Sequence, residues 1–328
     1  MIVTRTPFRI TLGGGGTDLP SYYSKYGGFV FSAGIDKYMF VDVNRPVVDD
    51  LIRLKYTQSE TVGSLNDVQH DIAREIFRKL GIDKGIEVSS IADISAGTGL
   101  GSSSCYAVGL LHALHTLKRD YVSLEQLAEE DFNVEADVLG RPIGKQDPYM
   151  AAFGGLTVMD ISKDGKVKVR KANISLETAD ELNRNMLVFY TGVTRSADGI
   201  LREQSSKISG DDKAVTESMH YIKELGQEIL EAIESDNITE VGRLFDHHWQ
   251  HKKKTSGKIT NPKFDEIYNI AKEAGALGGK VSGAGGGGFF TFYIEKNHQK
   301  LRDKIKSLGL REMRYRFDFE GSKVLIDF

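Results

Sequence analysis

Apolar residues recur along the chain with two different periods, and this pattern predicts a protein of mixed helices and strands. In residues 28–44 and 155–172, β-branched and aromatic residues alternate with polar ones and are interrupted by turn residues, which is typical of strands and hairpins. Residues 186–193 and 289–295 are short apolar runs that predict buried strands. Segments with a longer apolar period lie between these strands and predict helices.

The helical segments carry their own start and stop signals. An apolar residue recurs at every fourth position across residues 68–80, and Gly81 is the expected stop. Ser123, with Gln126 three residues later, is a capping-box signature at the start of another helix. Helices are expected over residues 68–80, 123–140, 214–234 and 263–276.

The length of the chain allows one large domain or two ordinary ones. A polar, charged segment around residues 173–185 is the best candidate for a boundary within the 328 residues. We therefore expect an N-terminal domain over residues 1–180 and a C-terminal domain over residues 181–328.

Charge and cysteine content exclude several kinds of partner. The formal net charge of −3 gives no general attraction to nucleic acid or to an anionic membrane. Cys105 is the single cysteine, so an internal disulfide is excluded, which suits a reducing compartment. The first residues lack an apolar stretch of signal-peptide length, and no run approaches ~18 apolar residues. We expect a cytoplasmic protein with small-molecule partners, and a homodimer is left open.

Glycine is concentrated at three places in the sequence. The chain has 35 glycines in 328 residues, above the usual share of ~7%, and many of them lie at 13–16, 97–101 and 283–288. Low-complexity disorder is one explanation for such an excess, but strand-like or helix-like sequence flanks each cluster. We therefore expect three ordered loops in which backbone N–H groups can approach a ligand closely.

The middle cluster lies in SAGTGLGSSS, residues 95–104, directly before an amphipathic pattern. A glycine turn there delivers three serines to the start of a helix, where unpaired N–H groups and a partial positive charge favour an anion. Serine N-capping beside a plain turn is the alternative. The sequence has no G-x-x-x-x-G-K-[ST] motif, and the dinucleotide fingerprint lacks its third glycine in register. A phosphate loop of another kind is therefore indicated.

Three separated segments resemble the motifs of the GHMP kinases, the family named for galactokinase, homoserine kinase, mevalonate kinase and phosphomevalonate kinase. PFRITLGGGGTD at residues 7–18 is similar to the first motif, SAGTGLGSSS at 95–104 to the phosphate loop, and KVSGAGGGGFF at 280–290 to the third motif. They follow the family's order and span most of the chain. One departure is Ser95, where the family's loop usually has proline, but the glycines and serines that face phosphate are retained.

The resemblance implies an α+β fold of two domains with the active site between them. The N-terminal domain would be like the second domain of ribosomal protein S5, and the C-terminal domain would be ferredoxin-like. ATP and Mg²⁺ are implied as well, and they suit phosphoryl transfer, which needs charge neutralisation and alignment more than covalent catalysis. The residues expected to contact the nucleotide phosphates are Gly97, Gly99, Leu100, Gly101, Ser102, Ser103 and Ser104.

Four polar residues take catalytic roles by the same resemblance. Ser103 and Glu135 look like the Mg²⁺ ligands. Asp147 looks like the catalytic base, and Arg9 like the cation beside it. The alternatives are an exposed helix carboxylate for Glu135 and the cap of an Asp-Pro turn for Asp147.

The first motif, residues 7–18, indicates which class of sugar accepts the phosphoryl group. Galactokinases have a glutamate and a histidine before Thr-Asp, whereas GGGGTD is more similar to the family members that act on heptose phosphates and on fucose. The resemblance is greatest to members that phosphorylate the anomeric hydroxyl of D-glycero-D-manno-heptose 7-phosphate, on the way to nucleotide-activated heptose. Asp18 is the expected sugar ligand, with an Asx-type turn as the alternative. The expected substrate-binding residues are Gly15, Gly16, Thr17, Asp18, Arg195, Gly283 and Gly285.

A substrate that already carries a phosphate needs a cationic pocket, for which the sequence offers several candidates. They are Lys37, Lys145, Arg195 and the lysines of residues 247–258, although a run of three lysines is more typical of a solvated helix face. The histidines at 247, 248 and 251 are expected at the surface rather than on zinc. Two rival functions stay open: a kinase for an unphosphorylated sugar such as L-fucose, and a non-catalytic sugar or nucleotide sensor on the same fold.

Overall fold

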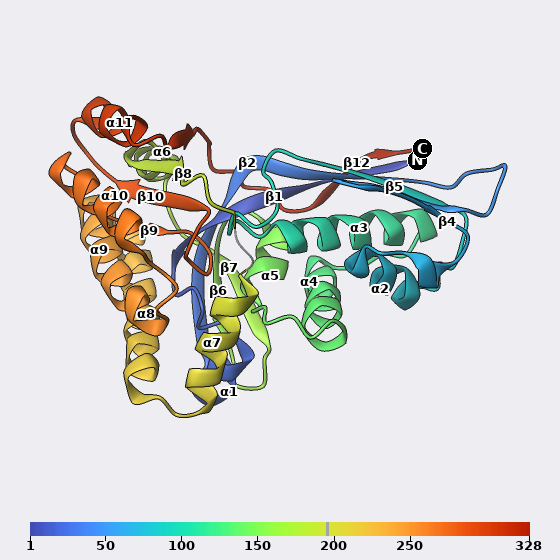
Figure 1. Cartoon of the computed structure of the whole chain (residues 1–328), viewed down its shortest axis with the longest axis horizontal. Coiled ribbons are helices and arrows are strands. Elements are labelled where there is room, and N and C mark those ends of the chain that lie inside the picture. Colours follow the sequence, from blue (N-terminus) through green and yellow to red (C-terminus); the bar gives the residue numbers. More distant parts are fainter. Residues whose placement is uncertain (195–196) are drawn as a thin grey trace.

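The computed structural model describes residues 1–194 and 197–328, which form two β-sheets flanked by helices (Figure 1). The larger sheet contains β1 (Ile2–Gly13), β2 (Gly28–Asn44), β3 (Ile52–Lys55), β4 (Ser59–Val62), β5 (Ile86–Ala92), β6 (Leu156–Ile161), β7 (Val167–Lys171) and β12 (Lys323–Asp327). The smaller sheet contains β8 (Met186–Tyr190), β9 (Gly278–Val281), β10 (Phe289–Tyr293) and β11 (Arg311–Met313).

The helices lie in both halves of the chain. They are α1 (Pro20–Tyr26), α2 (Asp71–Leu80), α3 (Ser102–Lys118), α4 (Leu124–Phe132), α5 (Gln146–Phe153), α6 (Leu176–Asn185), α7 (Asp198–Ser209), α8 (Lys213–Glu234), α9 (Ile238–Thr255), α10 (Pro262–Glu273) and α11 (His298–Ser307). Two short segments complete them, the 3₁₀ turn η1 (Leu65–Asp67) and the π-helical segment η2 (Asn133–Val138). The predicted mixture of helices and strands is confirmed.

The long strand β2 organises the larger sheet. It pairs with β1 on one edge, and on the other edge with β6 over its first half and β5 over its second half. The sequence predicts turn residues inside this segment, but the strand continues through them. Asp36 and Lys37 form a bulge, because the register with β1 shifts between Pro7 and Phe8. One continuous strand therefore joins both halves of the sheet.

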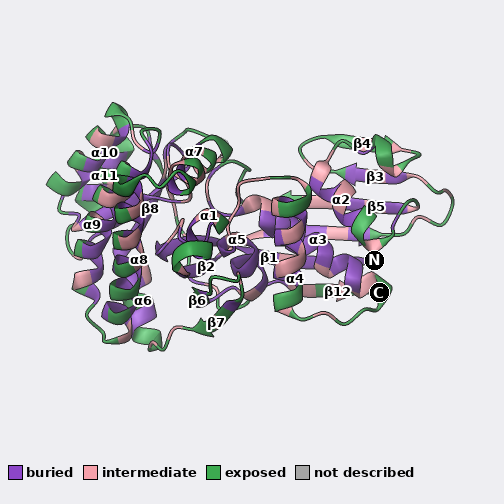
Figure 2. Ribbon diagram, turned by 90° about the horizontal axis from the view of Figure 1, so that it is seen from below, coloured by how far each residue is buried: buried purple, intermediate pink, exposed green. Residues whose placement is uncertain are grey.

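Helices α3 and α5 pack on this sheet and bury the main core, and much of α3 has the colour of buried residues in Figure 2. The predicted helix signals here are confirmed. Helix α2 ends where Gly81 takes a left-handed conformation with φ 66°. The Ser123 hydroxyl accepts a hydrogen bond from the backbone N–H of Gln126 at 3.1 Å. The helix predicted over 123–140 is regular only as far as Phe132, after which it becomes π-helical.

The smaller sheet has the strand order β11-β8-β10-β9, and all its pairs are antiparallel. Along the chain, helices separate β8 from β9, a loop joins β9 to β10, and α11 leads to β11. This is the β-α-β-β-α-β order of a ferredoxin-like domain, as predicted. Its own core is built mainly from aromatic side chains of α9, α10 and β10, namely Trp249, Phe264, Phe290 and Phe292.

The last strand returns to the larger sheet. β12 pairs with β1, and the amino group of Met1 donates to the carbonyl of Phe328 at 3.1 Å, so the two termini lie side by side (Figure 1). The division at residue 180 falls within α6 and stays a prediction, while residues 323–327 belong to the larger sheet. Among the described residues, no helix has the length and apolar character needed to cross a bilayer.

Helix α8 touches the end of β1 backbone to backbone. A Cβ added to Gly226 in α8 would lie 2.6 Å from the backbone nitrogen of Gly14, and one added to Gly13 would lie 2.5 Å from the Cα of Gly226. Because no side chain fits between them, the helix sits directly against the first glycine loop. This contact fixes the position of the loop relative to the helical half of the protein.

We expect Gly226→Ala to destabilise the protein, although alanine normally favours a helix over glycine by ~1 kcal/mol. The added methyl group would overlap the backbone of Gly13 and Gly14, and relieving that overlap costs roughly 1–3 kcal/mol. Thermal unfolding measures the effect. Gly199→Ala is the matched control, because the helical Gly199 has open space around its Cβ and its replacement should leave Tm unchanged or raised. Equal Tm values for both variants would contradict the proposed contact.

Candidate active site between the two sheets

The three glycine loops meet in one cavity of about 910 Å³. Each loop contributes residues to its lining. They are Gly15 and Gly16 of the first loop, five residues between 97 and 103 of the second, and Gly283 and Gly285 of the third. Cavities of ~300–1,000 Å³ hold small-molecule ligands, so this one is large enough for two substrates side by side. Segments that are far apart in the sequence thus form a single site.

The second loop leads directly into α3, as the sequence predicts. Gly97, Gly99 and Gly101 have φ values of 75°, 77° and 86°, which glycine adopts without strain. The helix begins at Ser102, and the side chains of Ser102 and Ser103 line the cavity in front of its first turn. The N-terminus of a 17-residue helix, with its free N–H groups, therefore faces the cavity.

Two residues of the predicted phosphate loop support it from behind. Leu100 is completely buried in the main core, and its carbonyl accepts from the backbone N–H of Arg9 at 3.3 Å. Ser104 is 1% exposed, and its hydroxyl donates to Glu135 at 3.0 Å. Neither residue lines the cavity.

The second and third loops interlock through their backbones. A Cβ on Gly99 would lie 2.9 Å from the carbonyl oxygen of Ser282, and a Cβ on Gly283 would lie 2.6 Å from the carbonyl oxygen of Gly99. A Cβ on Gly288 would overlap the carbonyl oxygen of Thr98 at 2.0 Å. The glycines of the third motif are therefore required for close approach to the phosphate loop, rather than for chain flexibility.

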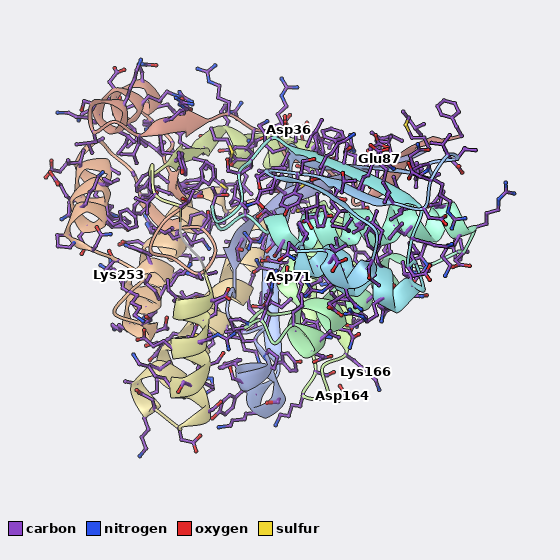
Figure 3. The ribbon with its side chains drawn as sticks, turned by 45° about the vertical axis from the view of Figure 1, so that its right-hand side comes forward. Asp36, Asp71, Glu87, Asp164, Lys166 and Lys253 are labelled. Atoms are coloured by element: carbon purple, nitrogen blue, oxygen red, sulfur yellow. The ribbon has the colours of Figure 1, made fainter. Side chains whose placement is uncertain are left out.

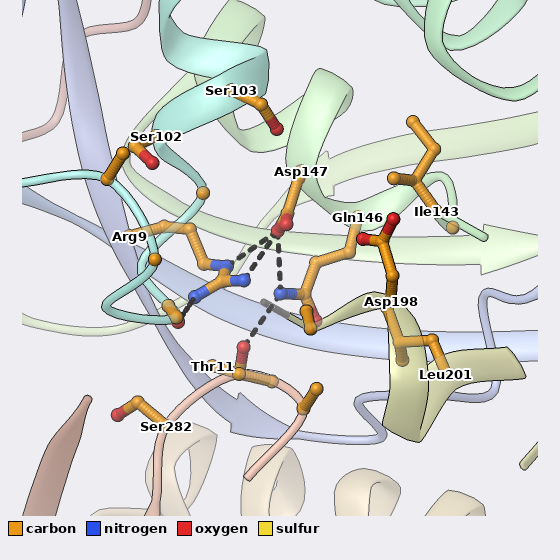
Figure 4. Close-up of a pocket in the computed structure, with 18 of the residues that line it drawn as sticks. Arg9, Thr11, Ser102, Ser103, Ile143, Gln146, Asp147, Asp198, Leu201 and Ser282 are labelled. Atoms are coloured by element: carbon orange, nitrogen blue, oxygen red, sulfur yellow. Dashed lines mark hydrogen bonds and ion pairs between the residues drawn. The ribbon is translucent and has the colours of Figure 1, made fainter. Parts of the chain in front are cut away.

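Arg9 and Asp147 form the polar centre of the cavity (Figure 4). The Arg9 guanidinium contacts the Oδ1 atom of Asp147 through Nη2 at 2.6 Å and through Nε at 2.8 Å. Its Nη1 donates to the carbonyl of Gly99 at 2.6 Å. The Gln146 amide donates to Thr11 at 2.7 Å and to the same Oδ1 at 3.2 Å.

The second carboxylate oxygen of Asp147 is left for a ligand. Within residues 1–194 and 197–328, the hydrogen bonds and ion pair of this carboxylate go to Oδ1, so Oδ2 keeps its acceptor capacity. The Arg9 side chain is only 5% exposed, whereas that of Asp147 is 30% exposed. A fixed positive charge thus lies behind a carboxylate that opens into the cavity.

Glu135 is buried at the edge of the cavity beside Ser103 and Ser104. Its carboxylate accepts from Ser104 at 3.0 Å and pairs with Arg141 at 2.8 Å, and Arg141 also pairs with Asp71, which is labelled in Figure 3. Burial raises the pKa of Glu135, and the guanidinium and the serine hydroxyls oppose this shift. The alternative of an exposed helix carboxylate is therefore wrong for Glu135.

The residues around Glu135 fit a magnesium ion. Asp131 lies one turn earlier and is completely buried, and neither of its carboxylate oxygens has a hydrogen-bond partner in the described part of the chain. Burial and the nearby Glu135 raise the pKa of this carboxyl well above its usual range. Oxygen donors with unused acceptor capacity are what Mg²⁺ prefers, and it commonly takes one or two protein ligands together with phosphate oxygens.

Asp18 follows the first glycine loop and bonds to the start of α5. The Oδ1 atom of Asp18 accepts from the backbone N–H of Gly16 at 2.9 Å, and Oδ2 accepts from the backbone N–H of Gln146 at 3.0 Å. Asp18 is 6% exposed but still lines the cavity, and burial raises the pKa of its carboxyl. Thr17 is fully buried, bonds to the carbonyls of Gly14 and Phe29, and does not line the cavity.

The basic residues considered for a substrate phosphate are spread over the molecule. Lys37 pairs with Asp36, and Lys145 pairs with Glu129; neither lines the cavity. Arg195 lies outside the described residues. The solvated-face interpretation of the lysine run is correct for the exposed Lys254 but wrong for Lys252, which lines the cavity.

Two further groups in the cavity were missed by the sequence interpretation. His248 was predicted at the surface but is 2% exposed and lines the cavity, because it faces inward from α9. An aromatic group of Tyr56, His70 and Tyr106 lines another part, with ring centroids 4.7 Å apart in both neighbouring pairs. These three residues lie in loops and helices that carry no shared motif. His248 could have been placed inward by its helical spacing from the apolar Leu244 and Phe245, four and three residues earlier.

Comparison with known proteins places the chain in a family. Residues 67–155 match the model described as the GHMP kinases N terminal domain, and residues 229–309 match GHMP kinases C terminal. The D-glycero-alpha-D-manno-heptose 7-phosphate kinase of Campylobacter jejuni is 31% identical over 98% of this chain and 97% of its own length. The L-fucokinase/L-fucose-1-P guanylyltransferase of Bacteroides fragilis is 26% identical over 90% of this chain, which spans 34% of that relative.

A solved structure has the same architecture. The crystal structure of a D-glycero-D-manno-heptose 1-phosphate kinase from Bacteroides thetaiotaomicron superimposes with a TM-score of 0.82 at 24% identity and covers 100% of both chains. This likeness confirms the predicted two-domain fold. The chain belongs to the GHMP kinase family. It is an ATP-dependent phosphotransferase of the sugar-kinase type.

We expect Asp18→Asn to weaken both the fold and the site. The amide can keep only one of the two backbone contacts as an acceptor, and a buried N–H left without a partner costs about 1–3 kcal/mol. The Tm and the kcat of the kinase reaction should therefore fall together. Loss of the bond to the Gln146 backbone would displace Gln146 and the neighbouring Asp147. Asp160→Asn, at an exposed position of β6, is the control. A raised KM for the sugar at unchanged Tm would instead identify Asp18 as a sugar ligand only.

Proposed function

We propose that the protein transfers the γ-phosphoryl group of ATP to the anomeric hydroxyl of D-glycero-D-manno-heptose 7-phosphate. The product would be the 1,7-bisphosphate, a precursor of nucleotide-activated heptose. The observation that carries this choice is the similarity, along nearly the whole of both chains, to the Campylobacter jejuni kinase named for that substrate. The arrangement of Arg9, Asp147 and the three glycine loops supports the reaction type.

The nucleotide is proposed to bind along the second loop. Its phosphates would accept hydrogen bonds from the backbone N–H groups at Gly97, Gly99 and Gly101 and at the start of α3, where the helix end favours negative charge. Its base would lie against the aromatic group of Tyr56, His70 and Tyr106, whose faces suit stacking. Leu100 and Ser104 would act by holding the loop in shape.

Magnesium is proposed to bind at Ser103 and Glu135. When bound, the ion neutralises phosphate charge and orients the phosphoryl group. Ser104 and Arg141 hold the Glu135 carboxylate in place from two sides. Asp131, one helical turn before Glu135, is a second buried acidic group beside it.

The acceptor is proposed to lie between Asp147 and the first and third glycine loops, against Gly15, Gly16, Gly283 and Gly285. The sugar hydroxyl would donate its proton to Oδ2 of Asp147 while its oxygen bonds to the γ-phosphorus. The bond from that phosphorus to the bridging oxygen breaks, and ADP leaves. Arg9 would hold the base in position through Oδ1 and add positive charge near the transferring group.

A kinase for an unphosphorylated sugar is the second candidate function. The similarity to the Bacteroides fragilis fucokinase covers 90% of this chain, so an enzyme named for fucose is similar along most of its length. Lower identity over the shared region makes it the weaker candidate. Both functions use the same base, donor and loops, and they differ in whether a second phosphate must be bound.

Release of ADP from MgATP tests the proposal directly. D-glycero-D-manno-heptose 7-phosphate should give a far larger kcat/KM than the unphosphorylated heptose, mannose, L-fucose or mevalonate. A preference for L-fucose would replace the proposed substrate and retain the kinase. If none of these acceptors is phosphorylated, the proposed reaction is wrong and binding of ATP and sugars without turnover becomes the function to measure.

We expect Asp147→Asn to lower kcat by roughly 10²–10⁴-fold, because the amide cannot take the proton. The Kd for MgATP should stay near that of the wild type, since the phosphate loop is unaltered. Asp180→Asn, at an exposed position of α6, serves as the control for the loss of a carboxylate. A near-normal kcat for Asp147→Asn would show that another group accepts the proton.

A further inference from the structure

Three basic side chains gather on the wall of the cavity formed by the smaller sheet. His248 and Lys252 are one turn apart on α9, and Lys280 is on the adjoining strand β9. His248 is 2% exposed and Lys280 is 3% exposed, and all three line the cavity. His248 and Lys252 come from α9, whereas Lys280 begins the third glycine motif. The fold brings these two separate segments together.

The backbone contacts of the two lysines leave donors unused. The Lys252 ammonium donates to the carbonyls of Val281, at 2.9 Å, and Gly283. The Lys280 ammonium donates to the carbonyl of Leu12 and lies 4.7 Å from the centre of the Phe245 ring. An ammonium group has three N–H donors, so one remains on Lys252 and two remain on Lys280.

His248 has no hydrogen-bond partner within the described residues at either ring nitrogen, although it is buried. A buried polar side chain normally has a partner, because leaving it without one costs free energy. Both nitrogens belong to a residue that lines the cavity. Both ring nitrogens are therefore available to a ligand in the cavity.

Positive charge in this cluster is not balanced by carboxylates. Within residues 1–194 and 197–328, neither Lys252 nor Lys280 has an acidic side chain at ion-pair distance. Burial and the nearby Arg9 lower the pKa of Lys252 to about 7. Burial and Lys252 lower the pKa of Lys280, and burial and both lysines lower that of His248. An anion placed among them would remove this mutual repulsion.

We propose that His248, Lys252 and Lys280 bind the phosphate group of a phosphorylated sugar acceptor, an inference that rests on the proposed function. A phosphate offers several acceptor oxygens to the unused N–H donors of the lysines and to the imidazole of His248. The site is distinct from the phosphate loop, which lies at the start of α3.

The position of the cluster assigns it to the acceptor rather than to the nucleotide. Lys280 is bonded to the carbonyl of Leu12, directly before the first glycine loop. Lys252 is bonded to Gly283 of the third glycine loop. Both loops border the space assigned to the acceptor, whereas the nucleotide phosphates are assigned to the second loop and the N-terminus of α3.

The test compares kcat/KM for heptose 7-phosphate and for the unphosphorylated heptose in the wild type and in Lys252→Met, which keeps the length of the side chain. The ratio of the two values should fall about 10- to 100-fold, the effect of losing one charged hydrogen bond. KM for MgATP should stay near the wild-type value. Lys254→Met, from the exposed side of the same helix, is the matched control and should preserve the ratio.

The outcomes separate this inference from the proposed function. A wild type that does not prefer the phosphorylated sugar overturns the proposed substrate and the phosphate site together, before any variant is made. If the wild type has that preference and Lys252→Met keeps the same ratio of kcat/KM values, the proposed phosphate site is wrong and the proposed function stands. A rise in KM for MgATP that matches the rise for the acceptor also overturns it, since the cluster would then serve the nucleotide.

A second variant covers the case in which Lys252→Met does not fold. His248→Gln keeps a side chain of similar polarity, and it should lower the same ratio about 2- to 10-fold, the range for one neutral hydrogen bond. Inorganic phosphate should compete with heptose 7-phosphate in the wild type and more weakly in His248→Gln. If inorganic phosphate inhibits the wild type and His248→Gln equally, and the ratio of kcat/KM values is unchanged, the proposed phosphate site is wrong.

Discussion

The ion pair between Arg9 and Asp147 is the interaction on which the active site depends. The Arg9 side chain connects three separate parts of the chain. It extends from β1, and its guanidinium holds the carboxylate at the start of α5 and bonds to the carbonyl of Gly99 in the phosphate loop. Since Arg9 is almost completely buried, these bonds are shielded from solvent and from salt. The base, the nucleotide loop and the first strand therefore keep one geometry relative to each other.

Backbone contacts between glycine loops complete this geometry. The second and third loops approach so closely at Gly99 and Gly283 that neither could carry a side chain, and Gly226 brings α8 against the first loop in the same way. The sheets that provide these loops have different cores, one built on α3 and α5 and the other on aromatic residues of α9 and β10. The main core also includes Met186 and Val188 of β8 and Phe289 and Tyr293 of β10, so the two sheets pack against each other as well as sharing the cavity.

Much of this arrangement could be predicted from the sequence, because glycine, serine and capping residues act locally. The start of α3 at Ser102 and the cap at Ser123 depend on neighbours within four residues. Burial depends instead on the direction of each side chain. Successive residues of a helix point about 100° apart, so two lysines two positions apart point to nearly opposite sides: Lys252 faces the cavity and Lys254 faces solvent. The bulge at Asp36 and Lys37 was missed because the partner strand, not local sequence, maintains β2.

The return of the chain to the larger sheet has a mechanical consequence. Residues 172–175 lead from β7 toward the smaller sheet, and residues 314–322 lead back to β12. The second connection is fastened to the larger sheet on its way, since Asp318 exchanges backbone hydrogen bonds with Gly34 and Gly155. The smaller sheet is therefore inserted between β7 and β12 of the larger sheet and is held by a covalent connection at each end. Force applied to the two termini would act first on the pairing of β1 with β12 and not on the smaller sheet.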